Sequence, residues 1–409
     1  MPISFDASDR SARAQAHFHA MAADHMRPIA RKYDDHEHDL PTEWVDWYWK
    51  TGRFTSPGGE GASDGFVQVC MQAEELCWGD AGLYLRTPFA GLGGSAVAAT
   101  GTAEQKQKYL AVFADRSAQP AWGAMAITEP GAGSDSAAIE TTATLDGDHY
   151  VLNGTKIFCT GGDGAATSPA GFVVVWATVD KSAGRGGIKA FVVPSGTPGM
   201  EVVGLERKMG IRASDTATLR FESCRIPRAN LLGAEKVKRD DADVKQTGDK
   251  GFKGAMATFD ASRPLVAAMA VGVGRAALDL VKEELAKSGI TPRYDAPPTE
   301  LTAIERDLAE MEAELQAARL LTWRAASMMN RRLANNLEAS MAKAKAGSAV
   351  TKITQKAVEL LGPLGYSKKL LVEKWMRDAK INDIYEGTQQ INLLIVARRI
   401  LDYSSAMLR

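Results

Sequence analysis

One acidic residue near the end of the chain is placed where a carboxylate could act as a base. Glu386 lies between Tyr385 and Gly387, and an apolar helical period follows from Ile391. Burial beside an aromatic ring disfavours a charged carboxylate, which raises its pKa and suits it to proton abstraction near neutrality. Gly387 would let a ligand approach the backbone closely. The alternative interpretation is an ordinary helix start, where acidic residues are common.

A second candidate site is the segment 127–135, which reads Ile-Thr-Glu-Pro-Gly-Ala-Gly-Ser-Asp. Gly131 and Gly133 free the backbone for close approach, and Thr128 and Ser134 supply hydroxyl donors without bulk. This pattern is compatible with a binding loop, and also with an ordinary turn rich in Gly, Pro and Ser.

Two helical segments contain further candidates. Residues 259–264, Phe-Asp-Ala-Ser-Arg-Pro, are predicted to begin a helix, with Asp260 or Ser262 as its cap and Pro264 just inside. Residues 272–277 match Gly-x-Gly-x-x-Ala, a pattern of dinucleotide-binding folds. No strand precedes this match, which lies inside a helical run of small residues, so a Rossmann site is not predicted there.

The elements that must position these residues change type twice along the chain. Residues 1 to about 120 are mostly helical in pattern, whereas short β-rich runs with Gly and Asp-Gly turns follow as far as about 232. Long periodic segments at 258–287, 300–332 and 337–361 then predict helices again. We therefore predict an α+β fold with domains at 1–120, 121–232 and 233–409, the central one a small barrel or sandwich.

Local patterns within these domains give four further expectations. Thr102 is predicted to cap a helix that continues to residue 110. Hairpin turns are predicted at residues 146–148 and at Asn153-Gly154. The charged segment 233–250 predicts an exposed insertion, and the acidic, His-containing segment 34–39 predicts a solvated loop in preference to a metal site.

Composition excludes several classes of function. The 409 residues carry a net charge of −1, with 45% hydrophobic and 24% charged residues, so nothing favours nucleic acid as a partner. The longest apolar run, near 265–273, is too short to span a membrane. The four cysteines form no Cys-x-x-Cys pair, and the first residues lack a targeting pattern. These features predict a cytoplasmic protein with reduced thiols.

The motifs, taken together, resemble those of one family. Residues 377–380 (Arg-Asp-Ala-Lys), 384–391 (Ile-Tyr-Glu-Gly-Thr-Gln-Gln-Ile) and 395–398 (Ile-Val-Ala-Arg) resemble the C-terminal motif of the acyl-CoA dehydrogenases. Segment 127–135 is similar to the family's Thr-Glu-Pro-Gly-Ala-Gly-Ser-Asp loop, and 154–162 to its Gly-x-Lys-x-Trp-Ile-Thr-x-Gly strand, with Phe158 replacing the Trp. The resemblance covers residues 20 to 402. It implies a helical N-terminal domain, a central β domain and a C-terminal four-helix bundle.

The resemblance also implies a reaction and its residues. The reaction is α,β-dehydrogenation of an acyl-CoA thioester with FAD, with Glu386 as the base; some relatives carry the base where this chain has Ser262. The flavin contacts implied are Met125, Ala126, Ile127, Thr128, Ser134, Phe158, Thr160, Gly387, Thr388 and Gln390. The substrate contacts implied are Ser134, Asp260, Arg263, Tyr385, Glu386 and Arg398. The partners implied are an electron-transferring flavoprotein and further copies of the chain, as a homodimer or homotetramer.

Two departures from the family pattern affect FAD binding across a subunit interface. The family's Arg-x-Phe-Gly is absent from residues 288–298, where Arg293-Tyr294 is its nearest equivalent. In the Gln-x-x-Gly-Gly-x-Gly loop, which here begins at Gln355, Pro363 replaces the second Gly and removes an N–H that a phosphate would accept. One alternative is therefore a subunit of a heteromeric dehydrogenase. Another is a flavin oxidase or monooxygenase of the same fold, which Glu386 disfavours.

Overall fold

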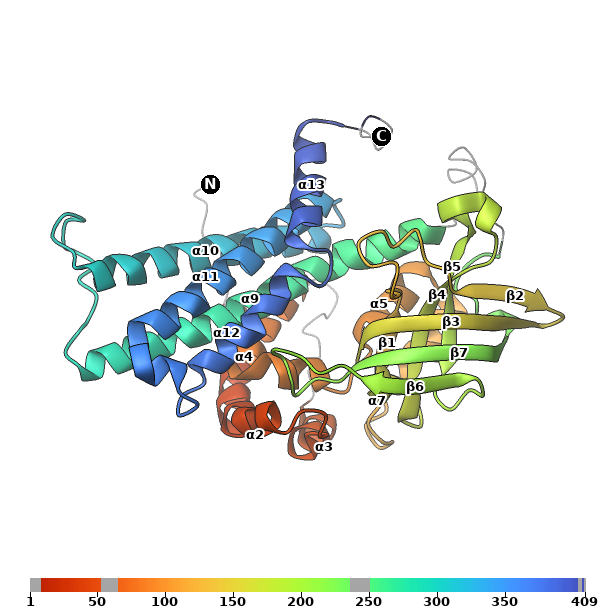
Figure 1. The fold of residues 1–409 in the computed structure, drawn as a ribbon, viewed down its shortest axis with the longest axis horizontal. Helices are drawn as coiled ribbons and strands as arrows, with labels where there is room; N and C mark the ends of the chain where they lie inside the picture. Colours follow the sequence, from red (N-terminus) through yellow and green to blue (C-terminus); the bar gives the residue numbers. More distant parts are fainter. Residues whose placement is uncertain (1–8, 53–64, 236–250, 404–406, 408–409) are drawn as a thin grey trace.

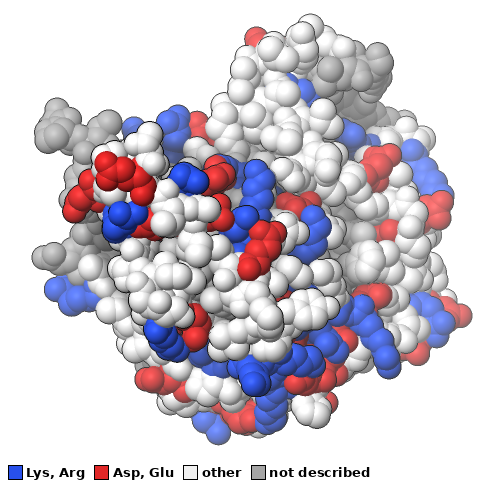
Figure 2. All heavy atoms as spheres, turned by 60° about the vertical axis from the view of Figure 1, so that its left-hand side comes forward, with Lys and Arg blue, Asp and Glu red and all other residues white. Residues whose placement is uncertain are grey.

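Along the chain a sheet region follows one group of helices and precedes another, as the α+β prediction requires, and in space the sheet lies at one end of the molecule with the long helices at the other (Figure 1). The computed structural model describes residues 9–52, 65–235, 251–403 and 407. The segment 236–250, which makes up most of the predicted insertion, lies outside the described residues. Lys and Arg are interspersed with Asp and Glu over the face shown in Figure 2, as expected from the small net charge.

In its described residues the N-terminal region is helical up to residue 113, and its central helix is buried. Alongside single turns of π- and 3₁₀-helix at residues 22–29 and 111–113, its helices are α1 (Asp9–Met21), α2 (Ala30–Asp35), α3 (Thr42–Thr51), α4 (Gly65–Arg86), α5 (Gly91–Thr100) and α6 (Ala103–Leu110). The predicted cap of α6 is confirmed: the Thr102 side chain accepts the Gln105 N–H, and the Gln105 side chain accepts the Thr102 N–H.

In the part of the chain that the structure describes, seven strands form one sheet in the order β1-β4-β2-β3-β7-β6, with β5 paired to β4. The strands are β1 (Gly123–Ala126), β2 (Thr142–Asp146), β3 (His149–Thr160), β4 (Phe172–Thr178), β5 (Ile188–Pro194), β6 (Met200–Leu205) and β7 (Thr216–Pro227). The rings of Tyr150 on β3 and Phe191 on β5 lie 5.0 Å apart although these strands are not neighbours. The sheet therefore curls over a core of its own.

Only one of the two predicted hairpins is present. β2 and β3 pair through a two-residue turn at Gly147-Asp148, where Gly147 has φ +59°. The prediction at Asn153-Gly154 is wrong, because β3 continues through both residues with a bulge in its pairing to β7. Gly154 lies against Thr141, so close that an added Cβ would come within 2.4 Å of the Thr141 Oγ1. Glycine is needed at position 154 because a side chain would collide with Thr141, and not because the chain turns there.

The C-terminal region is a bundle of long helices. Its helices are α9 (Gly251–Lys287), α10 (Ala303–Asn330), α11 (Asn336–Tyr366), α12 (Val372–Ala379) and α13 (Gln389–Ile400). Because α9 begins at Gly251, the predicted cap at Asp260 or Ser262 is wrong, and Pro264 lies inside the helix. Gly272 allows α9 to pack closely on α4: an added Cβ would come within 2.2 Å of the Glu74 carbonyl oxygen. The Gly-x-Gly match thus serves helix packing.

Helix α9 is also the one described helix long and apolar enough to cross a membrane by length and composition. Of its most apolar window, 78% is buried inside the protein. This degree of burial is that of a central helix in a helical bundle, which passes the same test of length and composition.

The segment 34–39 is in large part the solvated loop that its charge predicts, since Asp35, His36, His38 and Asp39 are exposed and residues 36–39 follow the end of α2, but two of its carboxylates make tertiary contacts. Asp34 is fully buried and pairs with Arg377, whose Nη2 lies 2.5 Å from its Oδ2. Glu37 pairs with Arg212, at 3.4 Å. These pairs join α2 to distant segments, so a charge run here stabilises tertiary contacts. Among the described residues, no group of three His, Cys, Asp or Glu side chains could hold a metal ion, and all four cysteines are free and buried.

Candidate active site

The position of Glu386 is set by α12, the helix that precedes it. Lys374 on α12 bridges Asp80 on α4 at 2.6 Å and Asp378 on α12 at 2.5 Å, and all three side chains are fully buried. The other oxygen of Asp378 accepts the Ile211 N–H at 2.6 Å, from the connection between β6 and β7. Because a buried charge is costly without partners, this cluster holds α12 against both α4 and the sheet region.

The same connection approaches α12 at a glycine. A Cβ added to Gly210 would come within 2.4 Å of the Arg377 carbonyl carbon and oxygen. The Arg377 guanidinium donates to the Met209 carbonyl at 2.9 Å as well as pairing with Asp34. The Arg377-Asp378 pair therefore joins three regions of the chain immediately before the base.

Helix α9 connects the two cores on either side of the site. In its first turns, Ala255 and Phe259 pack against the face formed by β4 and β5. From Val266 onward its apolar residues belong to the core shared with α4 and α11. Asp260, Ser262 and Arg263 lie between these two stretches, at the point where α9 leaves the sheet region.

Glu386 lies in a strained turn and accepts a hydrogen bond from α9. Its backbone is left-handed, with φ +57°, and Gly387 follows with φ +86°. The Ser262 Oγ donates to its Oε2 at 2.7 Å. Burial raises the pKa of Glu386, while the Ser262 hydrogen bond and the Arg263 and Lys343 charges act in the opposite direction. The carboxylate is therefore partly desolvated yet oriented, as a proton acceptor needs to be.

Arg263 is buried beneath this turn. Its Nη1 lies 2.7 Å from Asp260 Oδ1, and its Nε donates to the Glu386 carbonyl at 3.4 Å. Burial lowers the pKa of Arg263 and raises that of Asp260, and the pair offsets both effects. Two predicted substrate residues thus contact each other, and one of them contacts the base.

On the sheet side, the strand β3 presents an aromatic face. Phe158 has φ +56° at a break in the β3–β7 pairing, and its side chain is 59% exposed. The Ile157 N–H donates to the Thr128 carbonyl at 2.9 Å, which holds the 127–135 loop next to this face. An exposed aromatic ring beside hydroxyl and backbone groups fits a planar heteroaromatic ligand such as a flavin.

A buried ion pair fixes that loop. Lys156 Nζ lies 2.7 Å from Glu129 Oε1 and donates to the Ile127 carbonyl at 3.1 Å. The same carboxylate accepts the N–H groups of Glu140 and Thr141. Burial lowers the pKa of Lys156 to about 8, although Glu129 raises it. Gly131 and Gly133 lie beyond this anchor, with no atom within 4 Å of an added Cβ.

The remaining predicted residues lie on β1 and the loop after it, at the end of β3, and around α13. Met125 and Ala126 are buried in β1, Ile127 is buried just after it, Ser134 is exposed on the loop, and Thr160 ends β3 half-buried. Tyr385 donates to the Asn382 side chain at 3.1 Å. Thr388 caps α13, and Gln390 is exposed in its first turn. Arg398 lies about 15 Å from Thr388 along the helix axis.

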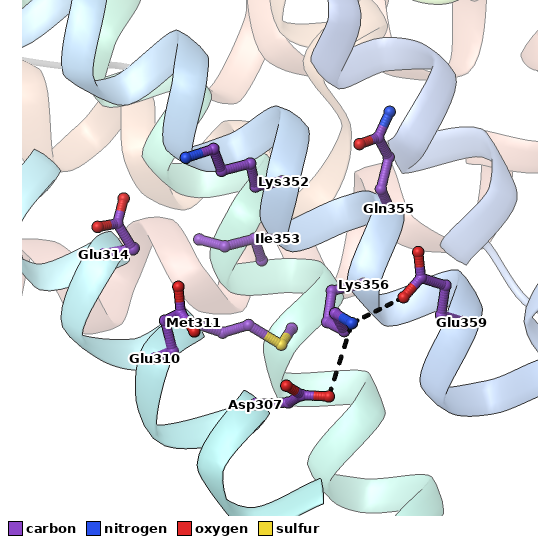
Figure 3. Close-up of a pocket in the computed structure, with 9 residues that line it drawn as sticks. All are labelled: Asp307, Glu310, Met311, Glu314, Lys352, Ile353, Gln355, Lys356 and Glu359. Atoms are coloured by element: carbon purple, nitrogen blue, oxygen red, sulfur yellow. Dashed lines mark ion pairs between the residues drawn. The ribbon is translucent and has the colours of Figure 1, made fainter. Parts of the chain in front are cut away.

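A surface groove of about 260 Å³ between α10 and α11 contains none of the predicted site residues (Figure 3). It does contain Gln355, where the sequence predicts the start of the altered FAD loop; in the structure Gln355 lies inside α11, which is kinked only at Gly362, just before Pro363. The residues that line it are Asp307, Glu310, Met311, Glu314, Lys352, Ile353, Gln355, Lys356 and Glu359. Lys356 pairs with Glu359 at 2.8 Å and with Asp307 at 3.6 Å. Arg293 is likewise paired, through both oxygens of Glu305.

Sequence reasoning missed three contacts of this site. It did not foresee the Ser262 hydrogen bond, the Glu129–Lys156 pair, or Lys343, whose Nζ donates to the Gly387 carbonyl at 2.7 Å. Lys343 has a detectable signal, because it occurs on the apolar stripe of α11 with Ala339, Ala346 and Val350. A lysine on a buried helix face requires a partner.

Comparisons with known proteins match the whole chain to one family. The N-terminal, middle and C-terminal domain models of acyl-CoA dehydrogenase match residues 8–117, 124–224 and 249–401. The mitochondrial short-chain specific acyl-CoA dehydrogenase of Bos taurus is 42% identical over 74% of this chain and 67% of its own length. The short-chain specific acyl-CoA dehydrogenase of Clostridium acetobutylicum is 34% identical over 93% and 94%. The butyryl-CoA dehydrogenase structure from Megasphaera elsdenii superposes with TM-score 0.82 and 32% identity, covering 98% and 100%.

Proposed function

Because this chain belongs to the acyl-CoA dehydrogenase family, we propose that it oxidises the Cα–Cβ bond of a short-chain acyl-CoA thioester, with Glu386 as the base. The observation that carries this proposal is the setting of Glu386. Its carboxylate is desolvated, lies in a left-handed turn, and is oriented by the Ser262 hydroxyl at 2.7 Å. The short acyl chain is proposed from the relatives named short-chain specific and butyryl-CoA dehydrogenase.

The family is FAD-dependent, so FAD is the cofactor of this chain's reaction. We propose that the exposed Phe158 ring covers one part of the flavin, and that Thr128, Thr160 and the backbone of 125–127 contact its polar edge. Gly387, Thr388 and Gln390 would contact it from the bundle side. When bound, FAD supplies the acceptor for the hydride that leaves the β-carbon.

The steps assigned to the protein concern the α-carbon. Glu386 removes the α-proton, and the Glu386 backbone N–H donates to the thioester carbonyl, which makes that proton more acidic. Ser262 orients the carboxylate without competing for the proton, since a hydroxyl is a far weaker base. We assign Tyr385 and the Asp260–Arg263 pair to the acyl-CoA beside the base, and Ser134 and Arg398 to its outer part.

We further propose that electrons pass to an electron-transferring flavoprotein, and that the chain is a homodimer or homotetramer. Support for a second copy comes from α13, which projects from the bundle (Figure 1). Leu393, Leu394, Ile400 and Leu401 on and after this helix are exposed, and an apolar surface of this kind favours a partner. The alternative partner is a different chain that supplies the altered FAD loop.

The experiment is anaerobic mixing of the purified protein with a series of straight and branched acyl-CoA thioesters, while bleaching of the flavin is followed. We expect the fastest bleaching with a short straight chain. No bleaching with any thioester would overturn the proposed reaction. Oxygen consumption by the reduced protein, measured in parallel, distinguishes a dehydrogenase from an oxidase.

A further inference from the structure

One buried charged residue next to the base has no part in the reaction described above. Lys343 on α11 is 1% exposed, and its Nζ donates to the carbonyl oxygen of Gly387 at 2.7 Å. Gly387 immediately follows Glu386. A buried ammonium is costly, and an alanine or methionine at this position would fill the helix face without that cost. The residue therefore requires an explanation in terms of its contacts.

The backbone that Lys343 holds is one that a glutamate rarely adopts. Glu386 has φ +57°, in the left-handed region that favours glycine, and Gly387 has φ +86°. Such a conformation persists only when the surroundings hold it. The Gly387 carbonyl accepts from Lys343 and also from the buried Asn392 Nδ2 at 2.8 Å, while Arg263 donates to the Glu386 carbonyl. Three side chains from three helices thus fix two consecutive carbonyl groups.

The charges that face Lys343 come from each neighbouring element. Glu386 and Asp383 raise its pKa, whereas burial and Arg263 lower it, so that the pKa is about 8. In return, the Lys343 charge lowers the pKa of Glu386 against the effect of burial. The Tyr385 ring lies 5.9 Å from the Lys343 Nζ. The amine can donate to the Gly387 carbonyl in both protonation states, whereas its effect on Glu386 requires the charged state.

We propose that Lys343 is a positioning residue for the base: it holds the Gly387 carbonyl, which keeps Glu386 left-handed, and it brings a positive charge to the turn that carries Glu386. This inference rests on the proposed role of Glu386 as the base. It adds a residue that acts through Glu386 and touches neither substrate nor flavin. A lysine that only stabilised the fold would change melting and flavin content together and would leave the pH dependence unchanged.

The test compares Lys343→Met with Lys345→Met, measuring flavin reduction as a function of pH. Lys345 lies on the same helix but pairs with Glu314 at 2.6 Å, away from the base. We expect Lys343→Met to slow flavin reduction by at least about tenfold and to move the acid limb up by about one pH unit. Lys345→Met should change neither. An unchanged rate and acid limb in Lys343→Met would overturn the proposal.

Two further measurements keep the test decisive. If Lys343→Met does not hold FAD, Lys343→Gln retains a donor without the charge, and it should still show the shifted acid limb. Glu386→Gln is measured alongside: if that variant stays active, the proposed function has failed, independently of Lys343.

Discussion

The turn at Glu386 and the groove between α10 and α11 both include residues of motifs shared with the family, but their surroundings differ. At the turn, Ser262, Arg263 and Lys343 are all buried and all donate to Glu386 or Gly387. In the groove, four carboxylates accompany two lysines, and the charge of Lys356 is already paired within the chain (Figure 3).

This difference bears on the proposal that the chain keeps the flavin-ring half of the FAD site and has altered the pyrophosphate half. Buried donors that converge on one acidic residue have a low cost of reorganisation, which suits catalysis. An exposed groove of net negative charge repels a phosphate, and a paired lysine must lose its partner before it can bind one. Among the described residues, the turn at Glu386 thus has the surroundings that a base needs, whereas the lining of this groove does not suit a phosphate.

The largest expected effect comes from comparing the carboxylate of Glu386 at the turn with that of Glu359 in the groove. Glu386→Gln keeps the shape of the side chain but removes the proton acceptor, so we expect flavin reduction to slow by about 10²–10⁴-fold with FAD retained. The matched control is Glu359→Gln in the groove, where the exposed carboxylate pairs only with Lys356 in the described residues. We expect no change of rate in that variant. Stopped-flow measurement of flavin bleaching compares the two, and near-normal bleaching by Glu386→Gln would contradict the assignment.

The second prediction concerns the cation beneath the base. Arg263→Ala should weaken acyl-CoA affinity by about 1.5–3 kcal/mol, the cost of a lost charge-assisted contact, and should weaken FAD retention less. The variant also leaves Asp260 without its partner at 2.7 Å. Titration with a non-reacting acyl-CoA analogue and a flavin count after gel filtration give the two quantities. If FAD is lost while substrate affinity is kept, Arg263 belongs to the flavin site.

The sequence predicts the order of the elements well, because periodicity and turn residues are local signals. The capped α6, the three long C-terminal helices and the strands around Val173 and Val192 all occur where the pattern places them, although α9 begins at Gly251 and not at residue 258. The predictions that failed did so because of contacts between residues that are distant in the sequence. Asn153-Gly154 forms a bulge because Thr141 packs against it, and Asp34 is buried because Arg377, which is 343 positions away, pairs with it.

For the candidate site, too, the sequence predicts local motifs but not the contacts between residues far apart in the chain. A motif identifies Glu386, but no pattern along the chain shows that Ser262 and Lys343, on two other helices, contact the same turn. Similarly, the acidic character of the groove depends on the packing of α10 against α11, and is not visible in either helix alone.

The third prediction is the pH dependence of the turn. Burial raises the pKa of Glu386, and the base must be ionised to act, so the rate of flavin reduction should fall as the pH decreases through that raised pKa. Ser262→Ala removes a hydrogen bond that lowers this pKa, and should move the acid limb to higher pH by less than about one unit. A limb that moves to lower pH would show that the hydroxyl favours the protonated acid.

The smallest expected effect is in the groove. If Lys356 clamped the FAD pyrophosphate of a neighbouring subunit, Lys356→Gln would lose a charged phosphate contact and FAD affinity would fall by tens to hundreds of fold, on the order of a few kcal/mol. Because Lys356 already pairs with Glu359 and Asp307, we expect FAD affinity to stay within about twofold of the unmodified chain. Flavin per subunit, counted together with the mass of the assembly, measures this. A loss of FAD in Lys356→Gln would show that the groove does bind the cofactor and that a neighbouring chain rearranges its ion pairs. An unchanged and incomplete flavin content would instead favour a second kind of chain as the source of the clamp.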